Sequence, residues 1–104
     1  MAVDIGNDEN FNSYLSENSK VIVKFHADWC GNCRLFAPKF KRLSKSSEHV
    51  DVGFLDVNAE QNADARKAAG VTNLPYFAAF RDGELVGGFS GTKEEAVVNL
   101  INRL

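Results

Sequence analysis

The stretch Trp29-Cys30-Gly31-Asn32-Cys33 contains both cysteines of the chain, separated by two residues. An apolar run typical of a buried strand, residues 21–25, lies just before it, and a helical pattern over residues 34–43 lies just after it. Residues three apart on the first turn of a helix share a face, and a small adjustment brings two sulfur atoms there within bonding distance. The sequence therefore predicts a redox-active dithiol at the junction of a strand and a helix.

The two cysteines are expected to take different roles. Cys30 lies where the helix begins, and there the unpaired backbone N–H groups and the helix dipole stabilise an anion. We therefore expect Cys30 to be the attacking thiolate. Cys33, one turn deeper, is placed to resolve the mixed disulfide, so the Cys30–Cys33 disulfide is itself the redox group and no metal or organic cofactor is needed.

Composition narrows the class of protein. The 104 residues are enough for one domain, residues 1–104, and 44% apolar residues with eight Phe supply its core. The net charge of −2 gives no electrostatic case for binding nucleic acid or an acidic membrane surface. No apolar run reaches the length of about 18 residues that predicts a membrane span, and residues 1–5 lack the pattern of an export signal. Two cysteines without such a signal favour a cytoplasmic, reducing compartment, where a disulfide is usually transient and catalytic.

Strand and helix patterns alternate along the chain. Strand patterns cover residues 3–5, 20–26, 50–57, 76–80 and 84–89, and an Asp82-Gly83 turn joins the last two. Helical patterns begin near residues 7–9, after Cys33, at residue 59 (ending at Gly70) and at a capping box over residues 92–95. This order predicts an α/β fold whose central mixed sheet is mostly parallel with an antiparallel C-terminal hairpin, and whose helices cover both faces.

Several separated features resemble the thioredoxin family over the full length of the chain. They are the Ala27-Asp28-Trp29-Cys30-Gly31-Asn32-Cys33 motif, Pro38, Leu74-Pro75 before a strand, the Asp82-Gly83 turn and Gly91 before the last helix. The resemblance implies a thioredoxin-like fold and a thiol–disulfide oxidoreductase that reduces protein disulfides, with Cys30 as nucleophile and Cys33 as resolving thiol. It also implies a monomeric electron carrier, disulfide-containing substrate proteins and a thioredoxin reductase as electron donor.

The resemblance also implies a substrate groove beside the dithiol. A cis peptide bond at Leu74–Pro75 is expected to pack against the sulfur atoms and to shape this groove. The residues expected to line it are Trp29, Gly31, Asn32, Leu74, Pro75, Tyr76 and Gly91.

Four positions depart from the family pattern. Asn32 and Tyr76 stand where the family most often has Pro and Thr. Lys24 replaces a buried acid in the strand before the motif, and Phe54 is expected to replace the lysine that partners this acid on the next strand. The acid that would carry the proton of the resolving thiol is therefore missing. Lys24 is treated as a modulating residue whose ammonium either reaches solvent past the end of the sheet or stays near the sulfur atoms.

Several alternatives remain open. Pro75 can follow an ordinary trans bond, and Trp29 or Tyr76 can serve in packing instead of the groove. A zinc site is a further alternative, because the chain has four candidate ligands, although their spacing matches no common zinc motif. These ligands are Cys30, Cys33, His26 and His49. Two rival functions are a net oxidant or isomerase, favoured by Asn32 and Lys24, and a binding module whose dithiol is incidental.

Overall fold

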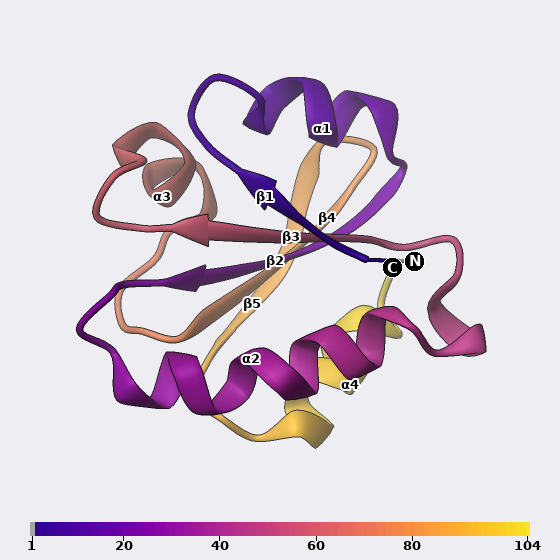
Figure 1. Ribbon diagram of the computed structural model, residues 1–104. Coiled ribbons are helices and arrows are strands. Elements are labelled where there is room, and N and C mark those ends of the chain that lie inside the picture. Colours follow the sequence, from indigo (N-terminus) through magenta and orange to yellow (C-terminus); the bar gives the residue numbers. More distant parts are fainter. Residues whose placement is uncertain (1) are drawn as a thin grey trace.

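The computed structural model describes residues 2–104 and contains five strands and four α-helices in these residues (Figure 1). The strands are β1 (Val3–Gly6), β2 (Lys20–His26), β3 (Gly53–Asn58), β4 (Tyr76–Arg81) and β5 (Glu84–Ser90). The helices are α1 (Phe11–Glu17), α2 (Gly31–Ser44), α3 (Ala63–Ala69) and α4 (Glu94–Ile101), with a short 3-10 helix, η1 (Ser47–His49), after α2.

The strands form one sheet in the order β1-β3-β2-β4-β5, so β2 lies at its centre. β1 and β2 both pair with β3 in parallel, whereas β4 is antiparallel to both β2 and β5. The predicted α/β fold with a mixed central sheet and an antiparallel C-terminal hairpin is confirmed. The turn of this hairpin has positive φ at Asp82 and Gly83, the backbone form that the Asp-Gly pair favours.

Each face of the sheet is covered by two helices, with α1 and α3 on one side and α2 and α4 on the other (Figure 1). Successive side chains of β2 point to opposite faces of the sheet, so its apolar residues are divided between the two faces. Val21, Val23 and Phe25 belong to the core cluster that includes residues of α1 and α3, and Ile22 belongs to the cluster that includes residues of α2 and α4. The sheet therefore separates two hydrophobic cores, and α2 packs on the face that carries Ile22.

Two helix starts differ from the sequence prediction. α1 begins at Phe11 instead of near residues 7–9, because Asn7 and Asn10 accept each other's backbone N–H groups at 2.9 and 2.8 Å in a turn that competes with a helix. The predicted capping box over residues 92–95 is wrong, since the residue at the cap position of α4 is Lys93, which makes no side-chain cap.

The two central segments also have different limits from those predicted. β3 starts only at Gly53, because residues 47–49 form the 3-10 helix η1 and the Val52 N–H then bonds back to His49 O at 3.1 Å. α3 starts at Ala63 instead of residue 59, and its first turn is held by a distant acid. The Asp8 carboxylate accepts the backbone N–H of Ala65 at 2.9 Å and that of Asp64 at 3.3 Å. The predicted end of this helix at Gly70 is confirmed by its left-handed φ of 69°.

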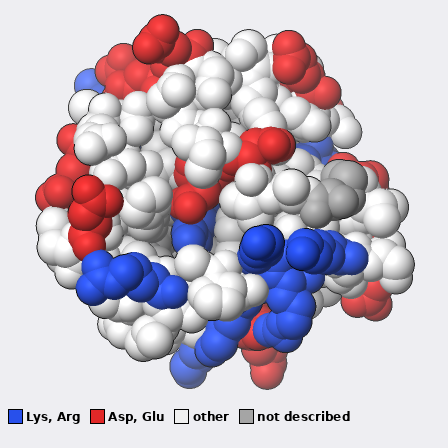
Figure 2. All heavy atoms as spheres, viewed as in Figure 1, with Lys and Arg blue, Asp and Glu red and all other residues white. Residues whose placement is uncertain are grey.

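Cationic side chains gather on one part of the surface. Figure 2 shows Lys and Arg concentrated along the lower part of the face, over α2, while Asp and Glu lie mostly above and to the side. The cationic residues of α2 are Arg34, Lys39, Lys41 and Arg42. The small net charge of the chain therefore conceals a basic surface that begins at the first turn of α2. Within residues 2–104, the structure contains no helix with the length and apolar character needed to cross a membrane.

Tyr14 of α1 makes the stability of the fold sensitive to alkaline pH. Its hydroxyl donates a hydrogen bond to Asp4 Oδ2 at 2.8 Å, and burial, followed by this contact, raises the pKa of Tyr14 well above its ordinary value. The unfolded chain loses the phenol proton near pH 10, whereas the folded chain loses it only at higher pH, so stability is expected to fall as the pH rises beyond about 10. We expect urea denaturation between pH 8 and 11.5 to show a steeper loss for the wild type than for Tyr14→Phe. Parallel losses in the two proteins would contradict this assignment.

Candidate active site

The dithiol lies where the central strand meets a helix. β2 ends at His26, a short loop follows, and Cys30 is the N-cap residue of α2, with its backbone N–H bonded to Ala27 O at 3.1 Å. Cys30 and Cys33 are joined in a disulfide with their Cα atoms 5.2 Å apart. The sequence prediction of a dithiol at this junction is therefore confirmed.

The two sulfur atoms have different surroundings. Cys30 Sγ accepts the backbone N–H of Cys33 at 3.1 Å, so an orphan donor of the first helical turn already points at this sulfur. Both side chains are largely buried, with exposed fractions of 5% for Cys30 and 2% for Cys33. A hydrogen bond to sulfur and the start of a helix both favour a thiolate at Cys30. Cys33, one turn further along, lies deeper in the protein.

The loop before β4 packs against the disulfide. Leu74 contacts the small cluster formed by Ala27 and the two cysteines, and the Leu74–Pro75 peptide bond is cis. The Pro75 carbonyl oxygen accepts the backbone N–H of Gly91 at 3.1 Å, which ties this loop to the end of β5. Gly91 has a φ of 139°, a backbone conformation that residues other than glycine rarely adopt.

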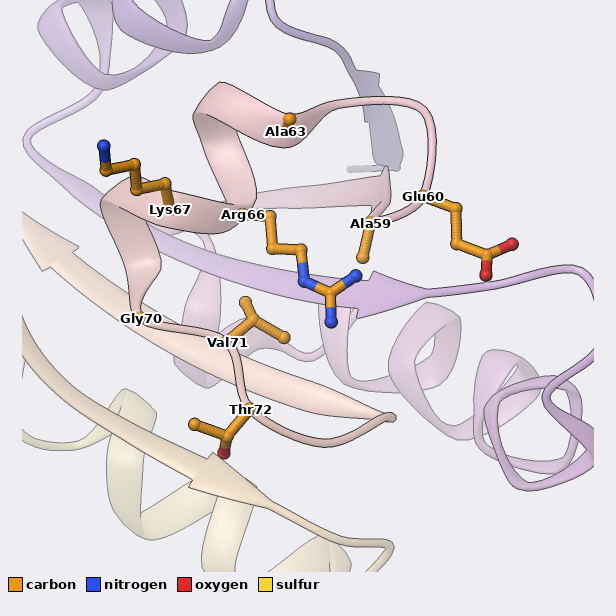
Figure 3. A pocket seen from close by; sticks show the side chains of 8 residues that line it. All are labelled: Ala59, Glu60, Ala63, Arg66, Lys67, Gly70, Val71 and Thr72. Atoms are coloured by element: carbon orange, nitrogen blue, oxygen red, sulfur yellow. The ribbon is translucent and has the colours of Figure 1, made fainter.

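Trp29 is the most prominent side chain at the surface of the site. Its exposed fraction is 66%, so it is not part of the core, and its indole N–H donates to Glu60 Oε2 at 2.7 Å. Gly31 and Asn32 are exposed beside it. Glu60 also borders an open hollow at α3, into which Arg66 extends while Lys67 points away (Figure 3). The sequence did not indicate Glu60, since its contact joins two distant loops.

Tyr76 has a packing contact. Its ring lies against the core cluster on the α1 and α3 side, and its hydroxyl occupies the space above Gly88, where an added Cβ would lie 2.1 Å away. The tyrosine is half-buried, so part of it remains accessible next to Pro75.

Lys24 does not reach solvent past the end of the sheet. Its exposed fraction is 3%, and its Nζ lies 3.6 Å from Asp56 Oδ2 on β3 and 5.7 Å from the centre of the Phe40 ring. The alternative in which its ammonium reaches solvent is therefore wrong. Lys24 and Cys33 line the same cavity, of about 280 Å³, so the lysine does lie on the side of the resolving sulfur.

The partner of Lys24 differs from the sequence prediction. Phe54 was expected opposite Lys24, but the parallel register of β2 and β3 pairs Phe54 with Ile22 and pairs Lys24 with Asp56. Asp56 therefore supplies a carboxylate beneath the dithiol, on a neighbouring strand. This register depends on tertiary packing, so no local sequence signal indicated it.

His26 joins the same group of charges. Its Nδ1 lies 2.7 Å from Asp56 Oδ1, so one carboxylate contacts both the lysine and the imidazole. His49, in contrast, packs against Phe54. No group of three or more His, Cys, Asp and Glu side chains within residues 2–104 is placed to hold a metal ion, and the geometry therefore offers nothing for the zinc alternative.

A disulfide between two cysteines at the start of a helix, with the loop before β4 packed against it, is the site of a thiol–disulfide oxidoreductase. The thioredoxin family model matches residues 2–103. Thioredoxins from Chlamydia pneumoniae and Ictalurus punctatus are each 34% identical to the chain, covering 97% and 98% of it and 97% of the relative in both cases. The solved Plasmodium falciparum thioredoxin superimposes with a TM-score of 0.87 at 29% identity, over 96% of this chain and 97% of that one. The chain belongs to the thioredoxin family, whose redox group is a disulfide.

Proposed function

We propose that this oxidoreductase reduces protein disulfides by a cycle in which Cys30 attacks and Cys33 resolves. The Cys30 thiolate attacks a substrate sulfur and forms a mixed disulfide, and Cys33 then displaces the reduced substrate and closes the Cys30–Cys33 disulfide. The observation that carries this assignment is the asymmetry of the pair, since Cys30 is the N-cap residue and its sulfur accepts a backbone N–H. We assign no metal or organic cofactor to the cycle.

A groove around the disulfide is proposed to hold the substrate backbone. Exposed Trp29, Gly31 and Asn32 form one side of it, and Leu74, Pro75, Tyr76 and Gly91 form the other. The backbone of the loop before β4 is proposed to pair with an extended substrate peptide. The side chains vary in size and polarity, which suits a carrier that accepts many protein disulfides.

A thioredoxin reductase is the proposed electron donor. A structural neighbour with a TM-score of 0.89 and 25% identity comes from a crystal structure of the complex between ferredoxin:thioredoxin reductase and thioredoxin f2, and this supports a reductase partner. We further propose that residues 1–104 act as a single monomeric domain in the cytoplasm. Sedimentation of the reduced protein tests the monomer.

Reduction of insulin tests the function directly. In the presence of dithiothreitol, the wild type is expected to accelerate precipitation of the insulin B chain well above the rate with dithiothreitol alone. A binding module with an incidental dithiol would give no acceleration. Activity that required no cysteine would also refute the proposed cycle.

Asn32 is expected to make the disulfide more oxidising than in thioredoxins with Pro at this position. Proline has no backbone N–H, so Asn32 provides one more donor near Cys30 in the first turn of α2. A better stabilised thiolate favours the reduced form, and about 1.4 kcal/mol corresponds to roughly 30 mV for two electrons. We expect a potential less negative than about −270 mV, and a shift of roughly 30 mV to more negative values in Asn32→Pro, measured by equilibration with glutathione.

Asn32→Ala is the matched control, because it removes the same side chain but keeps the backbone N–H. Its potential is expected to equal that of the wild type. Equal shifts in the alanine and proline variants would assign the effect to the amide side chain, and no shift in either would refute the role of this donor.

A further inference from the structure

The resolving cysteine faces a cavity lined with ionisable groups. The cavity, of about 280 Å³, lies between β2, β3 and the first turns of α2. The residues that line it are Lys24, His26, Asp28, Cys33, Arg34 and Asp56, with Ala27 and Ala37. Cys33 is therefore the only sulfur among these lining residues, and it shares the space with an imidazole, two carboxylates, an ammonium and a guanidinium.

Cys33 needs a proton acceptor when it acts. The thiol must lose its proton before it can attack the mixed disulfide on Cys30, because the thiolate is the nucleophile. Its exposed fraction is only 2%, and burial disfavours the charged thiolate. Solvent alone is therefore a poor acceptor for this proton, and a base inside the cavity has a clear role.

The Asp56 carboxylate orients one base in the cavity. His26 Nδ1 lies 2.7 Å from Asp56 Oδ1, a distance at which a protonated Nδ1 donates to the carboxylate. That tautomer leaves Nε2 with a free lone pair, and the carboxylate stabilises the imidazolium that forms when Nε2 takes up a proton. An imidazole can gain and lose a proton in the range of about pH 5 to 8. His26 is also 27% exposed at its side chain, so it can return the proton to solvent.

We propose that His26, oriented by Asp56, accepts the proton of Cys33 when the mixed disulfide is resolved, and that Lys24 stabilises the resulting thiolate. The inference rests on the proposed cycle and deepens it. The proton moves from Cys33 through the water of the cavity to His26. The Cys33 sulfur then forms a bond to the Cys30 sulfur, and the bond between Cys30 and the substrate breaks. The substrate leaves as a thiolate, which takes up one proton, and His26 gives up the proton that it gained.

The neighbouring charges act on His26 in opposite directions. Asp56 on β3 favours the imidazolium, and Asp28 in the loop before α2 adds a second negative charge to the cavity wall. Lys24 on β2 and Arg34 on α2 oppose the imidazolium. Lys24 Nζ is held 3.6 Å from Asp56 Oδ2, so its charge is partly offset before it acts on the histidine. The same lysine favours the Cys33 thiolate. His26 therefore accepts the proton, and Lys24 stabilises the negative charge that the proton leaves behind.

The lifetime of the mixed disulfide tests the proposal. Reduced protein is mixed with glutathione disulfide, quenched with acid at successive times and analysed by mass spectrometry, which separates formation of the Cys30 adduct from its resolution. His26→Asn retains an N–H that can donate to Asp56 but cannot accept a proton. We expect this variant to resolve the adduct at least about tenfold more slowly between about pH 6 and 7.5. The two profiles should approach each other as the pH rises, because hydroxide then removes the thiol proton without the histidine.

Three further measurements make the result decisive. His49→Asn removes the other histidine, which lies outside the cavity, and should resolve the adduct like the wild type. In a Cys33→Ala background, His26→Asn should leave the attack of Cys30 unchanged. In His26→Ala, added imidazole should restore resolution of the adduct. This second variant tests the proposal even if His26→Asn does not fold.

A wild-type pH profile in His26→Asn would overturn the proposal. So would an equal loss over the whole pH range without rescue by imidazole, because that pattern indicates a structural role. Failure of the wild type to form any Cys30 adduct would instead refute the proposed cycle, and the two failures are therefore distinguishable.

Discussion

Cys30→Ser is expected to abolish turnover of disulfide substrates, whereas Cys33→Ser should still attack them and then stop. The reason is the different position of the two sulfur atoms, since Cys30 caps α2 and receives a backbone N–H while Cys33 lies one turn inside. Loss of the nucleophile removes the covalent path entirely, an effect of several orders of magnitude on rate. Insulin reduction with dithiothreitol measures the loss of turnover.

The Cys33→Ser variant supplies the control for this assignment. Without a resolving thiol, the mixed disulfide on Cys30 should persist, and mass spectrometry of the intact protein should find one substrate adduct per chain. Adducts that accumulate on Cys33 in Cys30→Ser, with none in Cys33→Ser, would reverse the two roles.

Asp56→Ala is expected to lower the free energy of unfolding by about 3 kcal/mol, because it leaves Lys24 buried without its carboxylate. Lys24 is only 3% exposed and lies between β2, β3 and the Phe40 ring, so its ammonium is largely withdrawn from bulk solvent. Asp56 itself is 19% exposed, which places the expected effect at the lower end of the range for breaking a buried pair. Urea denaturation at neutral pH measures the change.

Lys24→Met is the matched control. It removes the buried charge and leaves Asp56 with His26 as its partner, so the expected loss is below about 1.5 kcal/mol. The double variant should be more stable than Asp56→Ala alone, because methionine removes the unpaired ammonium. Equal losses in the two single variants would show that the ion pair does not govern the stability of this cavity.

Local signals predicted most of the fold. The apolar run at residues 21–25, the Asp82-Gly83 turn and the glycine at residue 70 each act over a few neighbours, and the structure contains the strand, the hairpin and the helix end that they indicate. The dithiol was predictable for the same reason, since its two sulfur atoms lie within one helical turn. The starts of α1 and α3 were less predictable, because Asn7 bonds with Asn10 before α1 and Asp8 caps α3 from far along the chain.

The surroundings of the dithiol could not be predicted in the same way. Lys24 was identified as unusual, but its partner Asp56 lies on a parallel strand whose register is set by the packing of the helices and not by a turn. His26 was considered only as a zinc ligand, because its contact with Asp56 depends on the same register. Glu60 gave no signal at all, since it contacts Trp29 from another loop. Sequence patterns therefore predict the reactive sulfur atoms, whereas the groups around them depend on tertiary structure.

The chain passes through a short loop from the central strand β2, whose amides are protected, to the first turn of α2, whose amides are exposed. The amides of β2 are hydrogen-bonded to β3 on one side and β4 on the other, and both of its faces are covered. Such amides are expected to exchange their hydrogens with solvent mainly through global unfolding. The N–H groups of exposed Gly31 and Asn32 lie in the first turn of α2, where a helix offers them no backbone partner, so they are expected to exchange without unfolding. Deuterium uptake along this continuous segment should thus report the stability of the fold at β2 and the solvent exposure of the backbone in the reactive turn just beyond it. The disulfide can therefore open and close beside a strand whose amides stay protected.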